Sequence, residues 1–265
     1  MDIHTYMRAA DDEKPLDNMV ADGGLCAIFR TIGCIGDSLS SGEFESQNDQ
    51  GEKGYHDFYD YSWGQYIARS AGCTVYNFSR GGMTAKEYWN TFAEANDFWN
   101  PDKLCQAYIL ALGVNDLFGQ KQPLGSIADI CLEDYQQNAD TFAGYYARII
   151  QRIKSMQPKA RFFLMTMPRE NSDADTTRMA HAKLLNEMAD LFDYTYVLDL
   201  YRYAPVYDEA FRKAYYLGGH MNPAGYILTA RMVESYIDYI VRRHMEDFAQ
   251  VSFIGTPFHN ASAKW

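Results

Sequence analysis

Four segments of the chain carry residues that together could cleave an ester. Ser38 stands in a tight Gly-Asp-Ser turn, Gly82 ends a glycine pair, Asn115 lies in LGVNDLFG, and His220 lies in YYLGGHMNPAGY. A histidine can remove the proton of a serine hydroxyl as its oxygen attacks a carbonyl carbon. The resulting oxyanion needs donors, and the backbone N–H groups of Ser38 and Gly82 with the Asn115 amide can supply three. These residue types are suited to acyl transfer.

Secondary structure must bring these four segments to one place. The mainly apolar runs at 29–35, 74–78, 107–112, 161–166 and 195–200 predict strands that are covered on both faces. Helical periodicity predicts helices near 60–71, 84–97, 134–156 and 174–193, and a last helix after His220. This alternation predicts the α/β class, as a three-layer α/β/α doubly wound sheet of about five parallel strands. Sites in such sheets form beyond the carboxyl ends of the strands, where the four segments fall.

The same segments resemble the conserved blocks of a known family, the SGNH (GDSL) hydrolases. The first block reads GDSL at 36–39, the second aligns with 77–82, and the third reads GVND at 113–116. The histidine of the last block corresponds to His220, so the resemblance covers roughly residues 29–245. It implies a flavodoxin-like fold of lipase/acylhydrolase-like esterases, with Ser38 as nucleophile and His220 as base. It also implies an oxyanion hole built from Ser38, Gly82 and Asn115.

The last block departs from the family pattern. The family normally has D-x-x-H-P there, but Leu217 occupies the position three residues before His220. In serine hydrolases the aspartate fixes the histidine tautomer, and converting it to an amide lowers turnover by about 10⁴-fold. A backbone carbonyl in this flexible glycine loop, such as that of Leu217, could accept the ring N–H instead. Asp208 or Glu209, earlier in the same loop, could also fold in. We favour the carbonyl, and hence a Ser-His dyad with backbone help.

Composition limits the classes of partner. The 265 residues are 47% hydrophobic, and 24 Lys and Arg against 35 Asp and Glu leave a net charge of -11. A negative surface disfavours nucleic acids and anionic membranes as partners. There is no HExxH motif, no P-loop and no GxGxxG after a strand, so we expect neither a metal nor another cofactor.

The expected location is the cytoplasm. The first 25 residues lack the apolar stretch of a signal peptide, and the longest apolar run, at 107–112, is too short to span a membrane. The five cysteines are widely spaced and never form CxxC, which favours free thiols over a disulfide framework. An exported form whose leader has been trimmed is the alternative.

We expect one SGNH hydrolase-like domain over 1–265, with an N-terminal arm (1–25), a catalytic core (26–246) and a C-terminal tail (247–265). The insertion at 40–66 is rich in tyrosine and acidic residues, and its first part has loop composition. Placed over the site, its aromatic faces and carboxylates could bind a polyol. The favoured function is cleavage of a small, acetyl-type acyl ester, of which carbohydrate deacetylation is one form. A thioesterase or lysophospholipase of the same family, and a catalytically dead binding protein, are the alternatives. The oligomeric state stays open.

Overall fold

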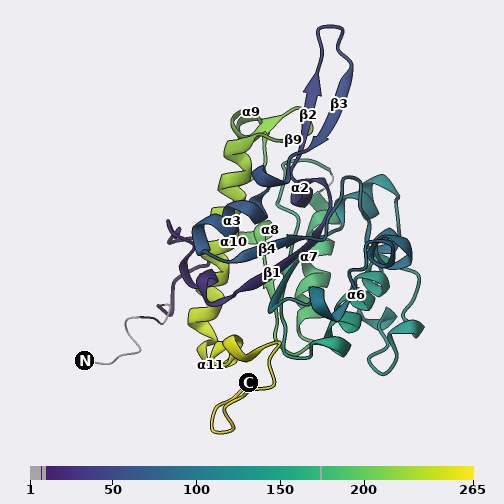
Figure 1. Cartoon of the computed structure of the whole chain (residues 1–265). Coiled ribbons are helices and arrows are strands. Elements are labelled where there is room, and N and C mark those ends of the chain that lie inside the picture. The colour runs from purple at the N-terminus through teal and green to yellow at the C-terminus, as the bar shows by residue number, and fades with distance from the viewer. Residues whose placement is uncertain (1–6, 8–9, 174) are drawn as a thin grey trace.

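One parallel sheet forms the centre of the computed structural model, which describes residues 7, 10–173 and 175–265 (Figure 1). Its strands lie in the order β4-β1-β5-β6-β7. Their bounds are β1 (Thr31–Gly36), β4 (Thr74–Asn77), β5 (Ala107–Ala111), β6 (Arg161–Met165) and β7 (Thr195–Leu198). Every neighbouring pair is parallel, so the predicted α/β sheet of five strands is confirmed. Numbered in sequence the order is 2-1-3-4-5, the flavodoxin-like order, whose switch point lies between β1 and β5.

Helices cover both faces of this sheet. One face packs against α3 (Trp63–Ala71) and α10 (Pro223–Arg243), and the other packs against α6 (Phe142–Met156) and α7 (Asp175–Ala189). Strand alternation divides the apolar side chains between the two cores. In β5, for example, Ile109 joins the α10 side, whereas its two neighbours join the α6 side. The mainly apolar strands thus bury both of their faces, as predicted.

The helix bounds differ from the prediction in two places. The helix expected from 134 begins at Phe142, because Thr141 caps it by accepting a hydrogen bond from the Gly144 N–H. The helix expected near 84–97 consists of α4 (Ala85–Glu87), the π-helical turn η3 (Tyr88–Phe92) and α5 (Ala93–Ala95). Residue 174, the predicted start of α7, lies outside the described residues. The remaining short α-helices of the described residues are α2 (Ser38–Ser41), α8 (Leu200–Tyr203), α9 (Glu209–Tyr215) and α11 (Met245–Phe248).

The insertion after Ser38 begins as a β-hairpin, which corrects the loop expected there. Strands β2 (Glu43–Gln47) and β3 (Lys53–Asp57) pair antiparallel, and the hairpin projects from the body of the molecule (Figure 1). A second, smaller hairpin of β8 (Tyr216–Leu217) and β9 (His220–Met221) leads into α10. Strand β2 lies against both β8 and β9, so the two hairpins meet.

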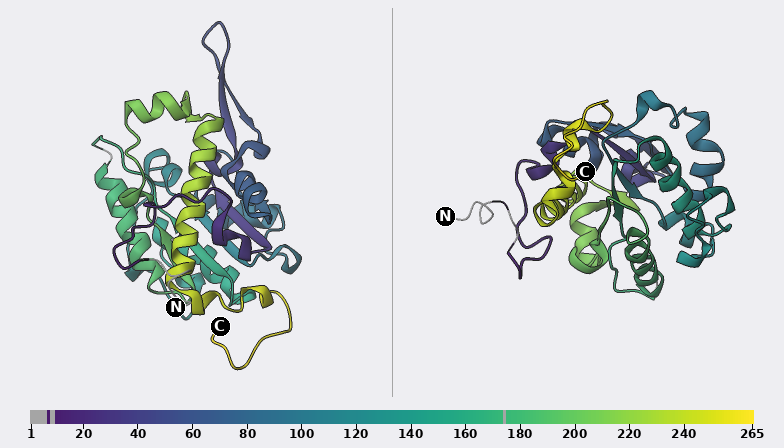
Figure 2. Two further views of the ribbon diagram at one scale, coloured as in Figure 1. Left: turned by 90° about the vertical axis from the view of Figure 1, so that its left-hand side faces the viewer. Right: turned by 90° about the horizontal axis from the view of Figure 1, so that it is seen from below.

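Both ends of the described chain pack on this core. Glu13 in the arm pairs with Arg242 of α10 at 2.7 Å, and Phe248 packs edge to face on Phe29 with ring centroids 6.2 Å apart. Figure 2 shows both the arm and the tail beside α10. Residues 1–6 and 8–9 of the predicted arm lie outside the described residues. All five cysteines are free, and three of them are buried. In the described ranges, no helix combines the length and apolar character that crossing a bilayer requires.

Candidate active site

Ser38 occupies the first position of α2, directly beyond the end of β1. Asp37 caps this short helix, with its Oδ1 accepting a hydrogen bond from the Leu39 N–H at 3.1 Å. The Ser38 side chain is half-buried and its hydroxyl makes no hydrogen bond to another described residue. The turn that follows β1 therefore presents the Ser38 hydroxyl at the edge of the sheet, as the sequence predicts.

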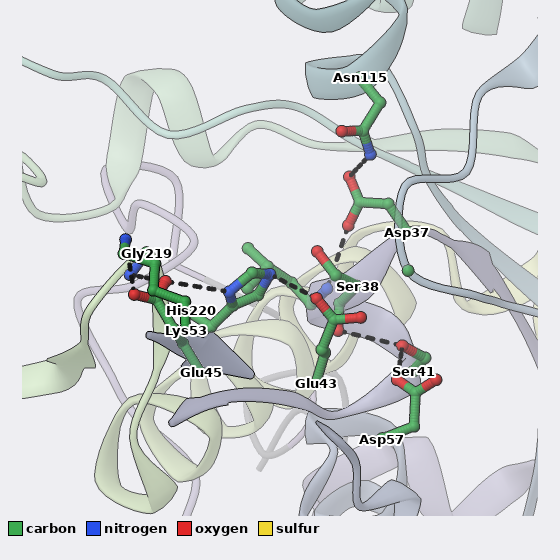
Figure 3. Close-up of polar contacts among 12 residues, drawn as sticks. Asp37, Ser38, Ser41, Glu43, Glu45, Lys53, Asp57, Asn115, Gly219 and His220 are labelled. Carbon is green, nitrogen blue, oxygen red and sulfur yellow. Dashed lines mark hydrogen bonds and ion pairs between the residues drawn. The ribbon is translucent and has the colours of Figure 1, made fainter. Parts of the chain in front are cut away.

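The predicted oxyanion donors lie at the ends of the two strands that flank β1. Gly82, after β4, has φ +72°, a left-handed conformation that glycine adopts without strain, and it is exposed. Asn115, after β5, begins the π-helical turn η5 (Asn115–Gly119). Its Nδ2 donates to the Met83 carbonyl at 3.2 Å and to Asp37 Oδ2 at 3.5 Å (Figure 3). The second bond is long and hence weak, so the amide can redirect that N–H.

Two buried carboxyl groups support these loops. Asp116 Oδ1 accepts a hydrogen bond from the Ala85 N–H at 2.8 Å, which ties the loop after β5 to the start of α4. Burial raises the pKa of Asp116 to about 7, and the neighbouring Asp37 adds to the effect. Burial likewise raises the pKa of Asp37 to about 6. Each carboxyl group accepts a hydrogen bond from the backbone of its loop or of the neighbouring helix. Burial disfavours the charged form of both.

His220 reaches the same edge from the second hairpin. It lies on β9, which packs against both α2 and β2, so the elements that carry Ser38 and His220 are in contact. The ring lies between two glutamates (Figure 3): its Nε2 is 3.0 Å from Glu43 Oε1, and its Nδ1 is 4.0 Å from Glu45 Oε2. The Tyr55 ring meets it edge on, with centroids 5.6 Å apart. Nε2 thus contacts Glu43 rather than the Ser38 hydroxyl.

The groups predicted to orient His220 do not contact its ring. Asp208 caps α9, with its Oδ1 accepting from the Phe211 N–H at 2.9 Å, and Glu209 lies inside that helix. Leu217 pairs with His220 across the β8–β9 hairpin, but the buried Nδ1 has no hydrogen-bond partner among the described residues, the Leu217 carbonyl included. The prediction of these three groups was therefore wrong. The carboxylates beside the ring come instead from the insertion that follows Ser38.

Glu43 and Glu45 stand two positions apart on β2, so both side chains leave the same face of the strand. The Glu-x-Glu spacing is the one feature of the sequence that could have indicated a pair of neighbouring carboxylates. It indicates this only if the segment is first recognised as a strand. The two carboxyl groups differ electrostatically. Burial raises the pKa of Glu43, whereas the hydrogen bond from Lys53, with that from the Gly219 N–H, lowers the pKa of Glu45.

The hairpin that carries these glutamates is held at its base. The Ser41 hydroxyl bonds Asp57 Oδ1 at 2.6 Å, and the Tyr226 hydroxyl donates to the Glu43 carbonyl at 2.6 Å. The first contact links β3 to α2, and the second links β2 to α10. The hairpin therefore connects α2, which carries Ser38, with α10, which follows His220.

A second histidine supports the loop after β5. His181 is fully buried on α7, and its Nε2 lies 3.2 Å from the Leu112 carbonyl. Burial lowers the pKa of His181 to about 4, so its ring is neutral near pH 7. The ring also fills the space beside Gly113, where an added Cβ would lie 2.7 Å from Nε2. From α7, His181 therefore supports the Gly-x-Asn-Asp loop.

A small apolar cavity of about 70 Å³ adjoins the turn that carries Ser38, although neither Ser38 nor His220 lines it. Leu39, which follows Ser38, and Met221, which follows His220, both line it. Trp63 and residues 165–168 at the end of β6 complete much of the wall. The cavity thus borders the segments that carry Ser38 and His220 without including either side chain.

The comparisons with known proteins agree with this architecture. The profile of the GDSL-like lipase/acylhydrolase family matches residues 34–228, which include Ser38, Gly82, Asn115 and His220. Curated protein sequences give no match.

Several solved structures share the fold. A family two carbohydrate esterase from Clostridium thermocellum, solved with cellohexaose, is 16% identical with a TM-score of 0.56, over 80% of this chain and 64% of that chain. A protein from Lactobacillus plantarum is 19% identical with a TM-score of 0.59, over 79% and 97% of the two chains. A possible lipase from Chitinophaga pinensis is 18% identical with a TM-score of 0.50, over 80% and 98%. With a match over most of its length, this chain belongs to the GDSL-like lipase/acylhydrolase family of ester hydrolases.

Proposed function

We propose that this protein cleaves small acyl esters through an acyl-enzyme on Ser38. His220 takes the Ser38 proton at Nε2 while the serine oxygen attacks the ester carbonyl, and it returns that proton to the leaving alcohol. Water then attacks the acyl-enzyme with the same base, which releases the acid and restores Ser38. The observation that carries the proposal is that the elements bearing Ser38 and His220 pack together beyond the end of β1.

The oxyanion that forms in each step has three donors available. The backbone N–H groups of Ser38 and Gly82 make no hydrogen bond within the described part of the chain. The Asn115 amide can exchange its long bond to Asp37 for a bond to the oxyanion. Donors of this kind are each worth about 10²–10³ in rate.

One contact has to change before chemistry begins. Glu43 Oε1 occupies the Nε2 side of the ring, where the Ser38 hydroxyl must bind. Catalytic hydrogen bonds are often unformed in a ligand-free enzyme and form with the substrate. The Glu43 contact is also the feature that favours the alternative, a binding protein on an inactive hydrolase fold.

The size of the cavity supports a short acyl group. A volume of about 70 Å³ is about half of the 150 Å³ or so that holds benzene in a protein core. An acyl chain that enters this cavity from the Ser38 turn would be limited to about two to four carbons. Longer chains, as in lysophospholipids and fatty acyl thioesters, would have to extend outside it.

A carbohydrate is the favoured alcohol part of the ester. Three aromatic side chains of the insertion, Tyr55, Phe58 and Tyr61, are each about half exposed near the hairpin base. Flat aromatic faces next to carboxylates suit sugar rings, which have apolar faces and hydroxyl edges. Two of the solved structures that share the fold are family two and family three carbohydrate esterases from Clostridium thermocellum, so acetylated sugars are the first substrates to test.

Labelling with a fluorophosphonate tests whether Ser38 is activated, whatever the natural substrate. We expect the wild type to be labelled and Ser38→Ala to stay unlabelled with an unchanged melting temperature. Absence of label on the folded wild type would favour the binding protein. A series of p-nitrophenyl esters then tests the cavity: acetate and butyrate should be the best substrates, and a preference for chains of eight carbons or more would contradict the short acyl group.

A further inference from the structure

One of the two ring nitrogens of His220 lacks a hydrogen-bond partner among the described residues. Its Nδ1 is buried and lacks a hydrogen-bond partner within the described ranges, whereas Nε2 contacts Glu43. A buried polar nitrogen without a hydrogen-bond partner costs about 1–3 kcal/mol. The carboxylate facing Nδ1 belongs to Glu45, with Oε2 at 4.0 Å.

We propose that Glu45 is the residue that orients His220, in place of the aspartate that the D-x-x-H pattern would put at position 217. This inference rests on the proposed function and names a positioning residue for it. A closure of about 1.1–1.3 Å from the present 4.0 Å would bring Oε2 into the range of about 2.7–2.9 Å that charged pairs adopt. Nδ1 would then hold the proton, and Nε2 would present its lone pair to Ser38.

The surroundings of Glu45 hold its carboxylate in place. Its side chain is 7% exposed, Lys53 pairs with Oε1 at 2.7 Å, and the Gly219 N–H donates to Oε2 at 2.7 Å. An added Cβ on Gly218, whose φ is +69°, would lie 2.5 Å from the Glu45 carboxyl. The two glycines before His220 therefore leave room for a carboxylate that enters from the hairpin.

Glu43 does not suit this role, because it lies on the wrong side of the ring. In Figure 3, Ser38 and Glu43 lie to one side of the imidazole, and Glu45 and Gly219 lie to the other. A base that accepts the Ser38 proton needs that side free. An orienting carboxylate belongs on the opposite nitrogen, which faces Glu45.

The test compares Glu45→Gln with two controls. The glutamine keeps the size and the acceptor for the Gly219 N–H but loses the charge. We expect kcat on an acetyl ester, and the fluorophosphonate labelling rate, to fall about 10²–10⁴-fold with KM nearly unchanged. Glu43→Gln should lose much less. Asp49→Asn removes an acidic charge from the exposed turn of the same hairpin and leaves Glu45 untouched, so turnover at pH 8 should stay within a few fold of wild type.

A readout that does not depend on activity is the tautomer of His220, observed in long-range ¹H–¹⁵N NMR spectra and assigned with His220→Gln. The Glu43 carboxylate beside Nε2 favours the Nε2–H form at rest. We therefore expect the Nδ1–H form in Glu43→Ala, which removes that contact, and its loss in Glu43→Ala/Glu45→Gln. Three results would overturn the inference: Glu45→Gln within about threefold of wild type, Glu43→Gln losing more than Glu45→Gln, or a Glu43→Ala tautomer that the added Glu45→Gln leaves unchanged. An unlabelled wild type, with the Nδ1–H form in Glu43→Ala, would refute the proposed function and leave the role of Glu45 in orienting the ring supported.

Discussion

Replacing Asp116 by Asn should change how the stability of the fold depends on pH. The pKa of this buried carboxyl is about 7, against an ordinary 3.8, because burial disfavours the charge. Between these two values the folded state holds a proton that the unfolded state has released, so the wild type loses stability as pH rises from about 4 to about 7. A difference of roughly three pKa units, at 1.36 kcal/mol each, amounts to about 4 kcal/mol.

The Asp116→Asn variant removes this dependence. Its Oδ1 can still accept from the Ala85 N–H. Its amide nitrogen replaces Oδ2, which lacks a hydrogen-bond partner among the described residues, and leaves an unpaired donor at a cost of about 1–3 kcal/mol. That cost is the same at every pH. The unfolding free energy of the variant relative to wild type should therefore rise by about 4 kcal/mol between pH 4 and pH 8.

Urea unfolding followed by tryptophan fluorescence at pH 4, 6 and 8 measures this difference. In thermal unfolding it corresponds to about 8 °C, at roughly 2 °C per kcal/mol for a chain of this length. Asp49→Asn, which removes a charge from the exposed hairpin turn, is the matched control. A relative stability of Asp116→Asn that stays constant with pH, to within about 1 kcal/mol, would refute the reasoning.

Two further substitutions test the supports of the site. Asn115→Ala should lower kcat on an acetyl ester about 10²–10³-fold with little change in KM, because the amide is needed as the oxyanion forms; steady-state kinetics would contradict this with a loss below threefold. His181→Phe should lower the unfolding free energy at pH 7 by about 1–3 kcal/mol, because the Leu112 carbonyl loses its buried partner. An unchanged urea midpoint would show that this carbonyl finds another donor.

The sheet could be predicted from sequence because its physical signal is strong. Segments such as 107–112 are apolar throughout, which is typical of a strand that is buried on both faces of a parallel sheet. The positions of Ser38 and Asn115 followed, since parallel strands end at a common edge. The start of α6 was less certain, because Asp134 and Thr141 can both cap a helix, and Asp134 in fact caps only a short 3₁₀ turn.

The two carboxylates beside His220 were missed because their segment carries no burial pattern. Much of the β2–β3 hairpin is polar on both faces and projects away from the core, so its alternation does not separate apolar from polar residues. The search for a partner of His220 was also confined to nearby positions. Glu45 lies 174 positions before Gly219, from whose N–H it accepts a hydrogen bond, and only the tertiary structure brings it beside the histidine.

The hairpin joins the earliest and the latest parts of the core, and this sets an order of events during synthesis. The Ser38 turn and the first strands leave the ribosome long before the segment that contains His220 and α10. Until that segment docks, Glu43 and Glu45 have no imidazole to hold, and Tyr226 is absent from the hairpin base. A nascent chain can therefore begin to form its sheet while it remains unable to hydrolyse an ester, and activity should appear only when the last helix has folded onto the rest.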